Sequence, residues 1–71
     1  MNDLGLIYRL TRFEGKQLID CADEIVEIAK KMGYTVNVID PIFNPGSIDH
    51  EANRVNVRTD KDSKIVSFTI G

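Results

Sequence analysis

The segment that most constrains the fold of this chain is residues 40–53, a polar run without hydrophobic periodicity between two strand-like patterns. It contains Pro41 and Pro45, and proline lacks the backbone N–H that a strand ladder needs. Irregular connections longer than about 12–15 residues are uncommon in compact domains and are usually functional or disordered. A chain of 71 residues has little sequence to spare outside its core, so we interpret this segment as an exposed functional loop.

The clearest regular pattern precedes this loop and predicts a helix over residues 17–32. Apolar residues recur there every three or four positions, at Leu18, Cys21, Ala22, Ile25, Ile28, Ala29 and Met32. That spacing forms one apolar stripe on a helix, and the acidic residues lie early and the lysines late, as the helix dipole favours. Gly33 directly after the stripe is the expected C-terminal stop.

Alternating apolar residues predict three strands after the helix, over residues 34–39, 54–59 and 64–70. The last two strands are separated by the short turn "TDKDSK" and are expected to form an antiparallel hairpin. The first two are separated by the long loop, which permits them to lie parallel.

The N-terminal residues 1–13 are expected to form a short strand or an extended arm, because Leu6, Tyr8 and Leu10 alternate with their neighbours.

Seventy-one residues give no room for a second domain. The sequence therefore predicts a single α+β domain, in which one helix packs on a small mixed β-sheet. A long exposed binding loop, residues 40–53, lies between two parallel strands.

Composition excludes several classes of function. Hydrophobic residues make up 42% and charged residues 28% of the chain, which is typical of a globular protein and not of a disordered one. The formal net charge of −2 gives no basic footprint, so neither nucleic acid nor a membrane is an expected partner. No signal peptide is recognisable, and the localisation stays open between the cytoplasm and secretion after removal of a leader.

The chain offers no pattern typical of a metal or cofactor site. Its single cysteine, Cys21, cannot form an internal disulfide, and its place in the helical stripe indicates a small buried residue. His50 beside Asp49 and Glu51 is interpreted as ordinary loop surface. The turn "DKDSK" lacks the mid-loop glycine and the closing glutamate of a calcium loop. We expect no metal and no cofactor.

Enzyme activity is not expected either. Ser47, Asp49 and His50 are the residue types of a catalytic triad. Triad members converge from separated parts of a scaffold, whereas near-adjacent residues of an extended loop point apart.

The loop and the following strand contain a recognisable motif. The run "SIDHEANRVNV" has a serine, a variable residue and an aspartate, followed by the Asn-Arg-Val that opens a strand. Together with "EGK" before the helix, the order of the elements and the closing "TIG", it resembles the potato inhibitor I family, which includes eglin and the barley chymotrypsin inhibitor. A group of bacterial inhibitors with a similar core and an Arg-x-Asn-Val strand start is nearly as similar.

This resemblance implies a serine endopeptidase inhibitor whose loop enters the protease cleft as a substrate would. The protease-binding loop would comprise Pro45, Gly46, Ser47, Ile48, Asp49 and His50, with Ile48–Asp49 as the reactive bond. Arg54 would support the loop by holding Ser47 and Asp49, together with Asn56, which stands where the family often has a second arginine. The implied partner is a serine protease of the subtilisin, chymotrypsin or elastase type.

Two other functions remain open. The same scaffold can serve as a non-inhibitory protein-binding module, for instance in a small bacterial or phage protein that engages a host partner. A monomer is the expected state, but the chain could also form a homodimer through an exposed strand edge or through the apolar arm from Leu6 to Leu10.

Overall fold

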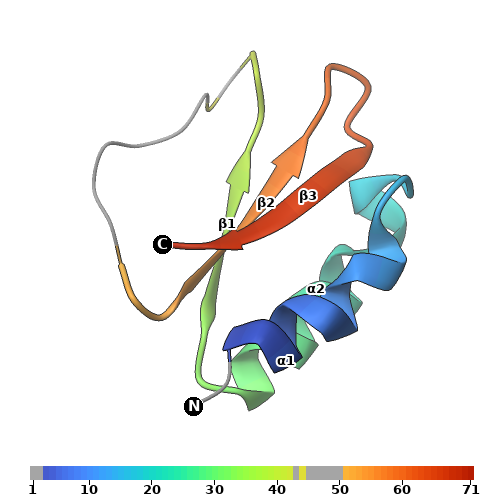
Figure 1. The fold of residues 1–71 in the computed structure, drawn as a ribbon. Coiled ribbons are helices and arrows are strands. Elements are labelled where there is room, and N and C mark those ends of the chain that lie inside the picture. The colour runs from blue at the N-terminus through green and yellow to red at the C-terminus, as the bar shows by residue number, and fades with distance from the viewer. Residues whose placement is uncertain (1–2, 43, 45–50) are drawn as a thin grey trace.

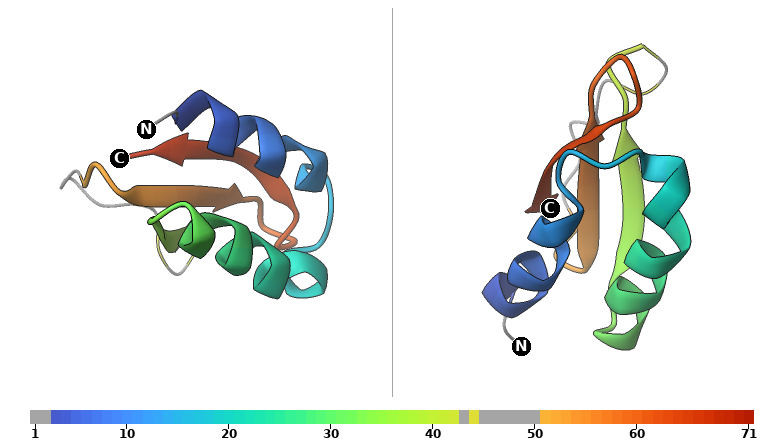
Figure 2. Two further views of the ribbon diagram at one scale, coloured as in Figure 1. Left: turned by 90° about the horizontal axis from the view of Figure 1, so that it is seen from below. Right: turned by 90° about the vertical axis from the view of Figure 1, so that its right-hand side faces the viewer.

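The computed structural model describes residues 3–42, 44 and 51–71. Its elements follow one another in the order α1 (Asp3–Leu10), the 3-10 helix η1 (Thr11–Phe13), α2 (Leu18–Lys31), β1 (Thr35–Ile39), β2 (Arg54–Thr59) and β3 (Ile65–Ile70). The three strands form one sheet in the order β1-β2-β3, and both helices cover the same face of it (Figures 1 and 2). The fold is therefore α+β with a small mixed sheet, but two α-helices pack on that sheet where the sequence predicted one.

Strand pairing makes the sheet mixed. β1 lies parallel to β2, with Thr35 opposite Arg54 and Ile39 opposite Arg58. β2 lies antiparallel to β3, with Val55 opposite Ile70. Parallel strands need a crossover of a dozen or more residues, which is usually helical. Here that connection is the segment from 40 to 53, as the sequence indicated, although Phe43 and residues 45–50 lie outside the described part.

The N-terminal strand or arm predicted for residues 1–13 is wrong, because residues 3–13 are helical. Leu6 and Leu10 have no exposed surface and Phe13 is almost fully buried, whereas 81% of Tyr8 is exposed. A strand would place Tyr8 on the same face as the two leucines. Burial instead follows a spacing of four and three residues, which is one stripe of an amphipathic helix.

The same burial shows that Leu6 and Leu10 do not lie on an exposed apolar arm. Leu6 and Leu10 belong to a single hydrophobic core formed by both helices and the sheet. Its buried members are Leu6, Leu10, Phe13, Cys21, Ile25, Ala29, Tyr34, Val55, Val57, Ile65 and Phe68.

Within the described residues, no helix is both long and apolar enough to cross a membrane.

Helix α2 begins and ends within one residue of the bounds that the sequence pattern predicted. Gln17 is the N-cap and Met32 the C-cap, so the predicted bounds of 17 and 32 are the two flanking residues. Gly33 follows with a φ of 83°, a left-handed conformation that glycine adopts at little cost. Its N–H donates to the carbonyl oxygen of Lys30, 3.0 Å away, which is a common way to end a helix.

The turn between β2 and β3 is held by Asp60. One carboxylate oxygen accepts the N–H groups of Asp62 and Lys64, each at 2.9 Å. The N–H of Lys64, with a smaller contribution from that of Asp62, lowers the pKa of Asp60. These bonds favour the ionised form, so the turn loses their support only as the pH falls through the lowered pKa.

Side chains alternate between the two faces of the sheet, as they must in a strand. Val55, Val57 and Thr59 of β2 are buried against the helical layer. The opposite face, called here the polar sheet face, carries mostly polar residues. Strand register places on it Thr35, Asn37, Ile39, Arg54, Asn56, Arg58, Ser67 and Thr69. Functional side chains predicted on β2 therefore lie away from the helices.

Candidate functional site

The candidate site is the part of the polar sheet face where Arg54 and Asn56 meet Gly71. The Nε of Arg54 donates to the carbonyl oxygen of Gly71 at 2.9 Å, and the Nδ2 of Asn56 donates to the same oxygen at 2.7 Å. The backbone N–H of Gly71 in turn donates to the carbonyl oxygen of Arg54 at 3.0 Å. Three hydrogen bonds therefore fix Gly71, the residue after β3, against the first half of β2.

Asn37 extends this network to the third strand. Its Nδ2 donates to the Oδ1 of Asn56 at 3.2 Å, and the parallel register places the two asparagines directly opposite each other. Only 8% of Asn56 is exposed, yet both ends of its amide have a partner. Buried polar groups are stabilising only when they are satisfied in this way. Asn56 is therefore the centre of a network that joins β1, β2 and the residue after β3.

The start of the long connection is fixed by a tight turn after β1. The backbone groups of Asp40 and Asn44 exchange two hydrogen bonds of 2.7 and 3.0 Å. A carboxylate oxygen of Asp40 also accepts the N–H of Ile42 at 2.7 Å, and the side-chain amide of Asn44 donates to the carbonyl oxygen of Val38. The chain therefore leaves β1 in a defined direction.

The end of the connection is tied to the opposite end of β1. The N–H of Thr35 donates to the carbonyl oxygen of Asn53 at 2.8 Å, and its hydroxyl lies 3.4 Å from the same oxygen. Because β1 and β2 are parallel, Asn44 and Asn53 lie next to opposite ends of β1. Five strand residues span about 17 Å at about 3.3 Å per residue. Both ends of the segment are thus held at a fixed separation.

The structure brings Arg54 and Asn56 together, but the other predicted site residues lie outside the described part of the chain. These are Pro45, Gly46, Ser47, Ile48, Asp49 and His50. The reactive bond Ile48–Asp49 and the contacts of Arg54 with Ser47 and Asp49 therefore stay predictions.

The sequence motif did not reveal two members of the network, Asn37 and Gly71. Asn37 could have been found from the predicted parallel pairing, since it falls opposite Asn56 once Val36 is aligned with Val55. Gly71 could have been found from the predicted hairpin, because antiparallel pairing of Val55 with Ile70 brings the next residue to Arg54.

Cys21 is held in the core and carries no reactive thiolate. It lies in α2 with 4% of its surface exposed, and its thiol is 3.4 Å from the carbonyl oxygen of Gln17. Burial raises the pKa of the thiol, so it stays protonated at neutral pH and lacks the charge of a nucleophile. Among the described residues, no group of three or more His, Cys, Asp and Glu side chains could hold a metal ion.

Asn56→Ala is expected to lower the free energy of unfolding by about 1–3 kcal/mol. The side-chain amide of Asn37 and the carbonyl oxygen of Gly71 each lose a hydrogen-bond partner in this variant. Urea denaturation followed by circular dichroism measures this. Thr69→Val is the matched control, since Thr69 lies opposite Asn56 on the same face but is exposed. Equal stability of the two variants would show that the network contributes nothing.

Comparison with known proteins adds no assignment: no family model matches the chain, and no curated protein matches it.

Proposed function

We propose that this protein inhibits a serine endopeptidase by presenting residues 45–50 as a substrate-like loop, with Ile48–Asp49 as the reactive bond. The observation that best supports this proposal is the convergence of Arg54 and Asn56 on Gly71. It fixes a guanidinium group at the residue where the long connection enters β2. An inhibitory loop without disulfides needs such a fixed support.

The guanidinium group of Arg54 has the chemistry to support the loop as well as Gly71. A guanidinium group has five N–H donors, and the Nε donor is bound to Gly71. The four donors on the terminal nitrogens suit the carboxylate of Asp49, which can accept two of them in a forked pair, and the hydroxyl of Ser47. With its Nε held, the guanidinium loses less freedom when it binds the loop. Arg54 would then brace the loop against β3 through Gly71.

Bracing converts a substrate into an inhibitor for two reasons. Ordering a flexible loop in the protease cleft costs about 0.5–1.5 kcal/mol per immobilised side chain, and a loop already held in the bound shape avoids much of that cost. If the Ile48–Asp49 bond is cut, the contacts of Asp49 with Arg54 would keep the new amine beside the acyl-enzyme. Religation then competes with hydrolysis, and the complex persists.

The connection between β1 and β2 supports the same proposal. Its start is held by the turn from Asp40 to Asn44, and its end by the bonds between Thr35 and Asn53. An extended loop that enters a protease cleft is bound largely through its backbone, as an added strand would be. Fixed ends limit the shapes that such a backbone can adopt.

Titration of the parent protein against subtilisin, chymotrypsin and elastase tests the proposal. We expect stoichiometric, reversible loss of activity for at least one of the three enzymes, and an elastase-like pocket accepts the β-branched Ile48 most readily. Full activity of all three, with digestion throughout residues 40–53, would overturn the proposal and favour a non-inhibitory binding module.

Ile48→Ala tests which residue enters the specificity pocket. Complete burial of an isoleucine contributes about 1.5–3 kcal/mol, so the inhibition constant is expected to rise about 10- to 150-fold. The matched control is Ile42→Ala, because Ile42 is an exposed isoleucine of the same connection outside the proposed binding loop. Equal effects of the two substitutions would show that Ile48 is not the pocket residue.

A further inference from the structure

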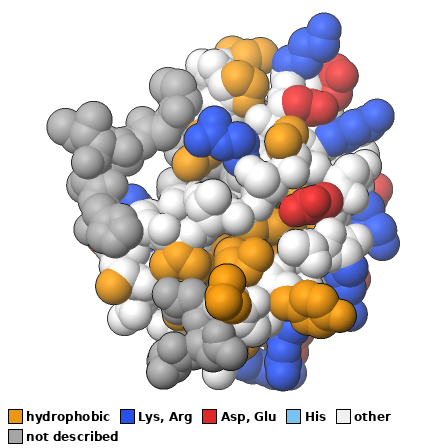
Figure 3. All heavy atoms as spheres, in the orientation of Figure 1, with side chains coloured by type: hydrophobic (Ala, Val, Ile, Leu, Met, Phe, Trp, Pro, Cys, Tyr) orange, Lys and Arg blue, Asp and Glu red, His pale blue; other side chains and the backbone are white. Residues whose placement is uncertain are grey.

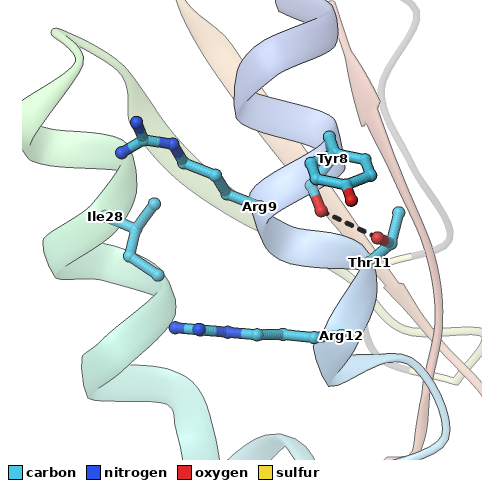
Figure 4. A pocket seen from close by; sticks show the side chains of 5 residues that line it. All are labelled: Tyr8, Arg9, Thr11, Arg12 and Ile28. Atoms are coloured by element: carbon cyan, nitrogen blue, oxygen red, sulfur yellow. Dashed lines mark hydrogen bonds between the residues drawn. The ribbon is translucent and has the colours of Figure 1, made fainter.

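The helical layer has a groove on its outer side that the proposed function does not use. It has a volume of about 640 Å³ and is lined by Tyr8, Arg9, Thr11, Arg12 and Ile28 (Figure 4). The arginine side chains extend from α1 and η1 toward α2 and lie on either side of Ile28 (Figure 4). The groove therefore has an apolar floor between two guanidinium groups.

The α1 side of this groove is both apolar and cationic. Leu4 and Tyr8, one helical turn apart, are 79% and 81% exposed, and hydrophobic side chains over α1 border a group of Lys and Arg (Figure 3). Arg12 lies 4.8 Å from the ring centre of Phe13. Neither Arg9 nor Arg12 forms an ion pair with any residue that the structure describes. In a chain with a net charge of −2, this is a local positive surface.

The outer face of α2 has the complementary character. With 3.6 residues per turn, Asp23 and Glu27 point away from the buried stripe of Cys21, Ile25 and Ala29. Val26 is exposed beside them. Glu27 lies 3.4 Å from Lys31 in an exposed pair, and such pairs contribute little. The acids are thus available to a partner.

We propose that the partner on this surface is a second copy of the chain. α1 lies over β3 and α2 over β1, side by side and antiparallel (Figure 2). A two-fold axis parallel to the helices and between two such layers places α1 of each copy over α2 of the other. This is an isologous interface, the commonest arrangement in homodimers.

In this dimer, the cationic and apolar side of α1 in each copy faces the acidic outer face of α2 in the other. Arg9 and Arg12 of one copy meet Asp23 and Glu27 of the other, twice by symmetry, and Tyr8 meets apolar surface of the facing α2. Standard interfaces bury about 800 Å² per partner, which is about one sixth of the 4826 Å² accessible to this chain. The polar sheet face lies on the other side of the sheet (Figure 2). A dimer through the helices leaves that face free, whatever its function is.

Sedimentation velocity over about 10 μM to 1 mM, at low and high salt, tests the dimer. The parent is expected to reach twice its mass of 8.0 kDa and to dissociate more readily at high salt. Arg9→Glu with Arg12→Glu, and separately Asp23→Lys with Glu27→Lys, are expected to raise the dimer dissociation constant at least tenfold. A 1:1 mixture of these two variants is expected to recover the dimer, because the opposed charges are restored across the interface.

The matched control is Arg58→Glu with Lys61→Glu, which reverses two exposed cations outside the helical layer and is expected to dimerise as the parent does. Circular dichroism verifies that every variant is folded. A parent that stays monomeric throughout the concentration range at low salt overturns the proposal. So does a mixture that stays monomeric, or a control that weakens the dimer as much as the helix variants do.

Discussion

Leu10→Ala is expected to lower the free energy of unfolding by about 2–5 kcal/mol. Leu10 is fully buried within the core between α1 and the rest of the fold, and truncating a buried leucine loses transfer free energy and leaves a cavity. Native domains have only about 5–15 kcal/mol of stability, and a chain of 71 residues lies toward the low end because it buries little surface. Urea denaturation followed by circular dichroism should show a large fall in the midpoint.

The control for this substitution is Leu4→Ala on the same helix. Leu4 is 79% exposed, so its truncation is expected to change the stability by no more than about 0.5 kcal/mol. If Leu10→Ala were as mild as Leu4→Ala, helix α1 would not be part of the core, and the prediction of an extended N-terminal arm would be restored.

Arg54→Ala is expected to convert a slowly cleaved inhibitor into a substrate. The variant loses the bond to Gly71 and, under the proposed function, the contacts with Ser47 and Asp49. Hydrogen bonds to charged groups contribute about 1.5–3 kcal/mol. Loss of one such bond between Arg54 and the loop is therefore expected to raise the inhibition constant about 10- to 150-fold. Cleavage within residues 45–50 should accelerate by a similar factor, whereas circular dichroism should still show a folded domain.

Arg58→Ala is the matched control for Arg54. Arg58 lies on the same strand and the same face, at the other end of β2, and should leave inhibition unchanged. Arg54→Lys keeps the charge but loses the planar fork, so an intermediate loss is expected. Inhibition by Arg54→Ala as strong as that by the parent would remove the proposed role of Arg54.

Sequence periodicity was informative where a single pattern fitted. The stripe in α2 has no competing interpretation, because its apolar residues fit only a helical period. In residues 1–13, Leu6, Tyr8 and Leu10 fit a strand, while Leu6, Leu10 and Phe13 fit a helix. Only the tertiary fold separates the two, since Tyr8 is exposed and the other three are buried. Local alternation was misleading because three apolar residues are too few to define a period.

The candidate site was predicted only as far as local motifs reach. Arg54 and Asn56 follow from the run "NRVNV", which places them on one face of a strand. Their partners, Asn37 and Gly71, come from other parts of the chain through strand pairing. Such contacts depend on the register of two strand pairs, and a shift by one residue would turn each side chain to the other face.

The proposal that a braced loop is taken for a substrate is tested most directly by locating the first bond that a protease cuts. Intact-mass spectrometry of the parent, incubated with the protease that it inhibits most strongly, gives the position. We predict a single slow cut between Ile48 and Asp49, with both fragments still associated and the protease still inhibited. Rapid cuts at several bonds between residues 40 and 53, with the protease fully active, would contradict the proposal.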